Sequence, residues 1–201
     1  MKVPAVGESI TEVTISINVA SLAFMVPLGI AMATTVRIGQ AAGRDDSAGV
    51  RAAARAGYGI VLATQLLTAS TMVFAGHAIA GIYTDDPAIR ALAGGLMMFA
   101  AAFQFPDGIQ ALSAGALRGL KDTYWPMVIT AVAYWGFGMP LGAWLGMDFG
   151  LGMGPRGMWI GLIAGLSAAS VFMTWRFMRL ARGLPETEPH ERTGPAGSAP
   201  A

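Results

Sequence analysis

The sequence predicts an all-α membrane protein, a polytopic bundle of about five transmembrane helices. Hydrophobic residues make up 54% of the 201-residue chain, charged residues only 12%, and the mean hydropathy is +0.55. Soluble domains carry roughly 25% charged residues, and about 20 apolar residues are enough to cross the bilayer core as a helix. Four stretches of 19 to 29 residues contain no Asp, Glu, Lys or Arg: 13–36, 56–84, 123–147 and 157–175.

The third of the five expected spans is the one that contains a charge, Asp107. Pro106, Asp107 and Gly108 are turn-forming residues, so a re-entrant hairpin is an alternative at this point. A continuous, kinked span is preferred because a hairpin would divide the basic residues five against eight, whereas a crossing helix divides them ten against three. The expected spans are 13–36, 57–83, 91–117, 124–147 and 157–175.

The distribution of Lys and Arg predicts the orientation. The loops that alternate along the chain place ten basic residues on one side and three, Lys2, Arg90 and Arg156, on the other. Basic loops are cytoplasmic as a rule. We therefore expect residues 1–12 to be an extracytoplasmic segment, 13–180 to be the transmembrane bundle, and the polar residues 181–201 to be a disordered cytoplasmic tail.

Several classes of function are excluded by composition. The chain has no cysteine, two histidines without metal-ligand spacing, and no P-loop, GxSxG or HExxH motif. We therefore expect no enzyme, no catalytic residue and no cofactor. The net charge of +1 gives no electrostatic surface for nucleic acid.

Small and aromatic residues predict how the helices pack and where they end. Gly161 and Gly165 form a GxxxG spacing inside the last span, which lets helices approach closely. Tyrosine and tryptophan rings prefer the headgroup layer. Such rings lie near the expected span ends: Tyr58, Tyr83, Tyr124, Trp125, Trp144, Trp159 and Trp175.

Asp107 is the leading candidate for a functional residue. Sixteen uncharged residues precede it and ten follow it before Arg118, which places it near the middle of the membrane. A carboxylate there costs about 2.5–3.5 kcal/mol on insertion scales, so binding of an ion, a proton or a cationic ligand is the favoured reading. The alternative is a capping or turn residue hidden inside the protein.

Polar side chains and prolines accompany Asp107. Gln104 and Gln110 lie three residues to either side of it, so a helix would present all three on one broad side. A water-filled cavity suits such a face, and hydrogen bonding between helices is the alternative. Further candidates are Gln65 and Tyr134 as cavity residues, and Pro27, Pro106 and Pro140 as helix breaks of the kind that transporters use around their sites.

Four segments resemble multidrug and toxic compound extrusion transporters, in particular the bacterial NorM-type branch. They are INVASLAFMVPLGIAMATTVRIGQAAGRDD (17–46), FQFPDGIQALSAGALRGLKDT (103–123), AYWGFGMPLGAWLG (133–146) and GMWIGLIAGLSAA (157–169). The resemblance covers about residues 11–182. It implies twelve helices in two six-helix lobes, with this chain equivalent to helices 8–12 of the second lobe, in a bacterial plasma membrane.

The same resemblance implies a function. Asp107 falls on the membrane-embedded acid that these transporters use to bind Na⁺ or H⁺, and Phe103, a cavity candidate, stands where some relatives have tyrosine. The expectation is efflux of cationic, lipophilic drugs by antiport with that ion. The chain would then have the lipid bilayer and a missing N-terminal lobe as partners. The alternatives are a truncated, non-transporting remnant, or a half-transporter that needs a separate first-lobe protein.

Overall fold

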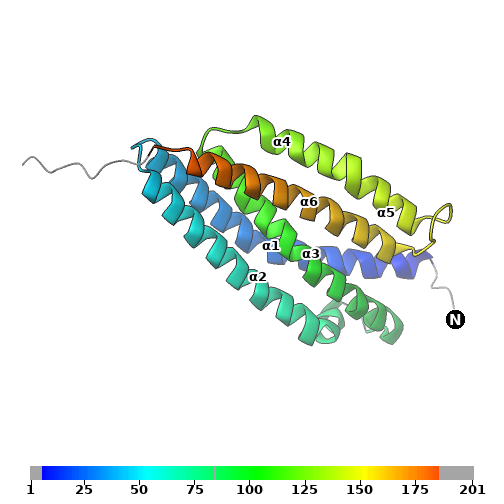
Figure 1. The fold of residues 1–201 in the computed structure, drawn as a ribbon. Coiled ribbons are helices and arrows are strands. Elements are labelled where there is room, and N and C mark those ends of the chain that lie inside the picture. The colour runs from blue at the N-terminus through cyan, green and yellow to red at the C-terminus, as the bar shows by residue number, and fades with distance from the viewer. Residues whose placement is uncertain (1–5, 84, 186–201) are drawn as a thin grey trace, which may run out of the picture.

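The computed structural model is an all-helical bundle, and it describes residues 6–83 and 85–185. Figure 1 shows long helices packed side by side. In chain order they are α1 (Val6–Ala42), α2 (Ser47–Tyr83), α3 (Pro87–Gly119), α4 (Tyr124–Ala131), the π-helix η1 (Val132–Gly138), α5 (Met139–Gly146) and α6 (Pro155–Arg182).

The expected spans correspond to these helices, with differences at the ends. Helix α1 begins at Val6, within the segment 1–12 that we expected outside the membrane, and α6 continues to Arg182. The expected tail from residue 186 onward and residues 1–5 lie outside the described residues. By length and composition, four described stretches are able to cross a membrane: Ile17–Ala42, Ser47–Tyr83, Tyr124–Gly146 and Pro155–Arg182.

Helix α3 has Gln104, Asp107 and Gln110 near its middle, and it is continuous. It has 33 residues and runs through Pro106, Asp107 and Gly108 without interruption. At 1.5 Å per residue it is about 50 Å long, enough to cross a bilayer. The prediction of a continuous helix through Asp107 is therefore confirmed, and a hairpin turn at residues 106–108 is excluded.

The three prolines do not end their helices. Pro27 and Pro106 are buried inside α1 and α3, and Figure 1 shows that α1 bends along its length. Pro140 lies in the first turn of α5, directly after the π-helix η1. Pro140 has no N–H to donate to the preceding turn, and Met139 directly before it donates to the carbonyl oxygen of Tyr134. The stretch of α4, η1 and α5 nevertheless continues through it without a break.

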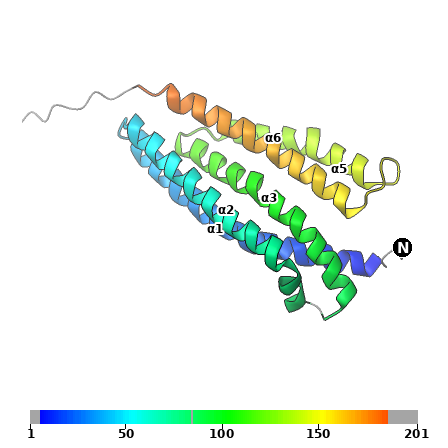
Figure 2. The same ribbon diagram turned by 60° about the horizontal axis from the view of Figure 1, so that its bottom comes forward.

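Helix α3 lies at the centre of the bundle. It packs against α1, α2 and α6, and Figure 2 shows it between the α1–α2 pair and α6. Its buried side chains include Met97, Leu112 and Leu117, none of which is accessible to solvent. The residues flanking Asp107 are therefore held by helices on three sides.

The bundle presents a strongly apolar outer surface. Phe74 is 89% exposed, Ile82 82%, Trp135 72% and Leu67 70%. Soluble monomers rarely expose large contiguous apolar patches. The surface is that of a protein surrounded by lipid.

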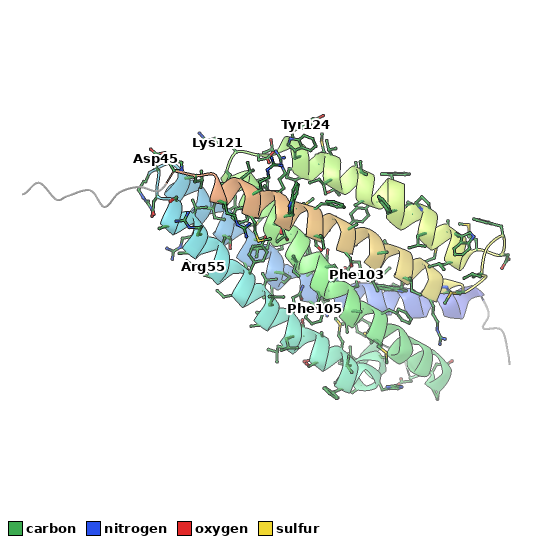
Figure 3. The ribbon with its side chains drawn as sticks, in the orientation of Figure 1. Asp45, Arg55, Phe103, Phe105, Lys121 and Tyr124 are labelled. Carbon is green, nitrogen blue, oxygen red and sulfur yellow. The ribbon has the colours of Figure 1, made fainter. Side chains whose placement is uncertain are left out.

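The basic loops gather at one end of the bundle. The α1–α2 turn, the α3–α4 turn and the end of α6 lie together (Figure 1), and Asp45, Arg55 and Lys121 lie toward this end in Figure 3. The Nε atom of Arg176 on α6 is 2.6 Å from Oδ2 of Asp122 in the α3–α4 turn, and its guanidinium lies 4.7 Å from the ring centroid of Trp125. These contacts fasten α6 to the turn at the arginine-rich end.

Glycines bring α6 into direct contact with η1 and α5. A Cβ atom on Gly161 would collide with the backbone of Gly142, and one on Gly165 would lie 3.0 Å from Cα of Gly138. The first position has no room for a methyl group, and the second contact is tighter than almost all Cβ contacts in proteins. The prediction that Gly161 and Gly165 serve close helix packing is confirmed.

We expect Gly161→Leu to destabilise the bundle by roughly 1–3 kcal/mol, because the side chain has no space between the two backbones. Thermal unfolding of the detergent-solubilised protein checks this as a lowered Tm. Gly59→Leu is the matched control, since a Cβ atom there meets nothing within 4 Å. Equal Tm values for the two variants would contradict the proposed packing.

Candidate functional site

A cavity of about 820 Å³ lies between α1, α3, η1 and α6. Its walls come from the N-terminal half of α1, the middle of α3, the π-helix, the α5–α6 turn and the first half of α6. Most of the lining is apolar or aromatic, including Phe24, Met25, Phe103, Met158, Trp159 and Leu162. The space and its walls suit an organic molecule of moderate size.

Asp107 is the one charged residue among those that line this cavity in the described part of the chain. Its side chain is half-buried, and the hydroxyl groups among the lining side chains belong to Ser21 and Tyr134. A carboxylate in apolar surroundings lacks the solvation that water would supply. It is consequently placed to bind a proton, a metal cation or the positive charge of an organic ligand.

The π-helix η1 places Tyr134 beside the cavity. The Tyr134 hydroxyl donates a hydrogen bond to Oε1 of Gln110 at 3.3 Å, while the same residue lines the cavity with Asp107. Gln110 thus orients the tyrosine from α3 and is not itself among the lining residues. Single π-helical turns inside α-helices are frequent at functional sites.

Gln104 and Gln65 lie on another side of α3, in its interface with α2. Gln65 Nε2 donates to the carbonyl oxygen of Gln104. The Gln104 side chain accepts from Thr68 Oγ1 at 2.8 Å and has its Nε2 2.8 Å from Met72 Sδ. Both glutamines are almost fully buried, and neither is among the residues that line the cavity. They hold two helices together, which was the alternative reading of this polar face.

The geometry of a helix explains why the expected Gln104–Asp107–Gln110 face is divided. Residues three apart are rotated by about 60° around the axis, so Gln104 and Gln110 are about 120° apart. In a helix with neighbours on three sides, that rotation is enough for the three side chains to face different partners. Gly108 contributes, because a Cβ atom there would collide with the amide of Gln65.

Phe103 lines the cavity as expected, and its principal partner is Trp159. The two rings are in an edge-to-face arrangement with centroids 5.6 Å apart and an interplanar angle of 90°. Trp159 is 5% exposed, so its ring packs inside the bundle rather than on the outer surface, and its place at the headgroup level stays a prediction. Its position near a span end was the only signal in the sequence, and that signal does not reveal a partner on α3.

A second set of polar contacts ties three helices together on the arginine-rich side of Asp107. The Ser113 Oγ atom on α3 is 2.7 Å from the hydroxyl of Tyr58 on α2 and 2.8 Å from Oγ1 of Thr174 on α6. Hydroxyl groups that bond across helices satisfy one another where no water is present. This chain of contacts fixes α3 relative to its neighbours.

Comparison with known proteins gives consistent matches over most of the chain. The sequence pattern of the family described as MatE matches residues 7–144. A probable multidrug resistance protein NorM of Xanthomonas axonopodis pv. citri is 60% identical over 173 residues, which are 86% of this chain and 37% of the relative. The multidrug resistance protein PmpM of Pseudomonas aeruginosa is 42% identical over 170 residues, covering 84% of this chain and 36% of the relative.

The fold is also found in solved transporters. The crystal structure of the eukaryotic MATE transporter AtDTX14 superposes with a TM-score of 0.79 at 17% identity, covering 88% of this chain and 40% of that one. An inward-facing multidrug resistance MATE family transporter of the MOP superfamily gives 0.74 at 16% identity, with 84% and 39% covered. The chain therefore spans somewhat more than a third of the length of the proteins it matches.

We expect Ser113→Ala to lower stability by about 0.5–2 kcal/mol, because it removes the hydroxyl that joins α2, α3 and α6. Ser170→Ala is the matched control, since Ser170 is also buried but its Oγ donates within its own helix, to the carbonyl oxygen of Ser167 at 2.9 Å. Unfolding in a denaturing detergent measures both. A larger loss for Ser170→Ala would contradict the assigned role of Ser113.

Proposed function

The chain belongs to the MatE family, and from that premise we propose that it forms the second lobe of a multidrug transporter that exchanges a cation for a drug. The ion taken up would be Na⁺ or H⁺, and the exported molecule a lipophilic cation. Relatives named as multidrug resistance proteins support the class of substrate.

The observation that carries this proposal is the single carboxylate of Asp107 in an otherwise apolar cavity. Placing a charge inside a membrane helix is costly, about 2.5–3.5 kcal/mol on insertion scales. A packing role would be served by an uncharged side chain. The energetic cost is explained if the carboxylate binds and releases an ion during transport.

The coupling follows from competition for one negative charge. The aromatic walls formed by Phe24, Phe103 and Trp159 favour a flat, apolar cation, and Asp107 supplies its counter-charge. Binding of Na⁺ or H⁺ neutralises the carboxylate and removes the electrostatic attraction for the drug. Exchange drives transport if the two occupied forms prefer different arrangements of the lobes, because a ligand shifts an equilibrium only by its differential affinity.

A first lobe is the partner that this mechanism needs. The chain spans 37% of the NorM relatives it matches, and alternating access requires a second body against which this bundle moves. We propose that the first lobe closes the open side of the cavity, whether it is supplied in the same polypeptide or by a separate protein.

We further propose that the arginine-rich end of the bundle is cytoplasmic. The excess of basic residues in loops at one end supports this orientation. The α5–α6 turn, which contributes to the cavity wall, would then lie on the opposite, extracytoplasmic side.

Asp107→Asn tests the ion-coupling role in a transporter that carries both lobes, reconstituted in vesicles with a drug inside. Asparagine keeps the size of the side chain but cannot bind a proton or balance a cation, so we expect efflux driven by a Na⁺ or pH gradient to fall to background. Asp148→Asn, an exposed acid outside the cavity, should transport normally. Undiminished efflux by Asp107→Asn would remove the coupling role, and imposing the two gradients separately identifies the ion.

Single cysteines test the orientation, because the chain contains none. Ala48→Cys near the α1–α2 turn and Asp148→Cys in the α5–α6 turn are both exposed and lie at opposite ends of the bundle. In intact cells we expect a membrane-impermeant thiol reagent to label Asp148→Cys and to reach Ala48→Cys only after lysis. The reverse pattern would invert the proposed orientation.

A further inference from the structure

A second cavity, of about 620 Å³, lies between the C-terminal half of α1 and the N-terminal half of α2. It shares no lining residue with the Asp107 cavity, and the proposed function makes no use of it. On the α2 side its wall is made of small residues, Gly49, Ala52, Ala53, Ala56 and Gly57. Because these side chains are short, the two helices leave a groove between them.

One end of the groove is positively charged. Arg37 lines it from the C-terminal part of α1 and Arg44 from the α1–α2 turn that follows, and both side chains are exposed. Among residues 6–83 and 85–185, neither arginine takes part in an ion pair. The one lining carboxylate, Asp46, accepts a hydrogen bond from the Gly49 backbone N–H at 2.7 Å. The guanidinium groups are thus available to an external anion.

The other end of the groove is apolar. Ile30 and Ala33 line it from α1 and Ile60 from α2, deeper along the helices than the arginines. Ile30 precedes Arg37 by seven residues, a distance of about 10 Å along the helix axis. The groove therefore passes from a cationic mouth to a hydrocarbon slot in the direction in which a phospholipid passes from headgroup to acyl chain.

We propose that this groove binds an anionic phospholipid. Its phosphate would lie between Arg37 and Arg44, because guanidinium groups form strong paired hydrogen bonds with phosphate oxygens. One acyl chain would fill the slot toward Ile30 and Ile60. Basic pockets between membrane helices favour acidic headgroups for this reason. A lipid also leaves both charges at the membrane surface, whereas a covering protein helix would have to bury them.

The surroundings favour lipid as the occupant. Met32 and Val36 on α1 are 62% and 58% exposed, and Ile60 and Leu62 on α2 are 52% and 43% exposed. Ile60 lines the groove, and the other three side chains belong to the outer, apolar faces of the same two helices. The groove is thus continuous with the lipid-facing exterior.

Native mass spectrometry of the full chain, titrated in detergent with phosphatidylglycerol or phosphatidylethanolamine, tests the proposal. We expect phosphatidylglycerol to bind at the lower concentration. In Arg37→Gln/Arg44→Gln its half-saturating concentration should rise about 25-fold, since each arginine contributes roughly a factor of five. Arg51→Gln/Arg55→Gln is the charge-matched control, because both residues are near the same end of the bundle and outside the groove lining.

A third variant, Ala56→Leu, fills the slot without changing any charge and should also weaken phosphatidylglycerol binding. The proposal is overturned if Arg37→Gln/Arg44→Gln binds phosphatidylglycerol like the unmodified chain, if the Arg51/Arg55 control loses as much, or if the two lipids bind equally well. A dimer that excludes lipid, and that becomes monomeric in the Arg37/Arg44 variant, would instead assign the groove to a second copy of the chain.

Discussion

The carboxylate of Asp107 has to be held where water is scarce, and the central position of α3 holds it there. Helix α3 contacts α1, α2 and α6, and its buried residues surround the turn that carries the acid. A charge on a peripheral helix would turn toward the membrane surface or unfold the segment locally. On α3 it faces a cavity of about 820 Å³ instead. Other contacts between the helices fix the position of α3.

Two kinds of contact do this, and they suit an environment in which lipid competes with apolar side chains. Close approach of backbones, as between Gly115 on α3 and Ala31 on α1, gains dispersion contacts that lipid cannot match. The hydrogen bond from Gln65 to Gln104 and the hydroxyl contacts that join Ser113 with Tyr58 and Thr174 satisfy polar groups between helices. Glycine seams and buried hydroxyls therefore position the cavity without contributing to its lining.

The helices and the membrane-embedded acid could be predicted from the sequence. The side chains that surround this acid could not. Long charge-free runs must be helices in a bilayer, and one charge inside such a run is conspicuous. Which polar residues meet Asp107 depends instead on rotations of about 60° between residues three apart. For that reason Gln104 was expected beside Asp107 and lies against α2. Tyr134, also named as a cavity candidate, does line the cavity, but from a π-helix that no periodicity indicates. Trp159 was expected at the membrane surface and is buried against Phe103.

In the proposed mechanism Asp107 binds one ion inside the bundle, either a proton that neutralises the carboxylate or Na⁺ that balances its charge. Infrared difference spectroscopy of the protein in lipid, recorded while pH or Na⁺ concentration is changed, observes that event directly. We expect a carbonyl or carboxylate stretching band that responds to one of the two ions and disappears in Asp107→Asn. A spectrum in which every responsive carboxyl band survives that substitution would contradict it.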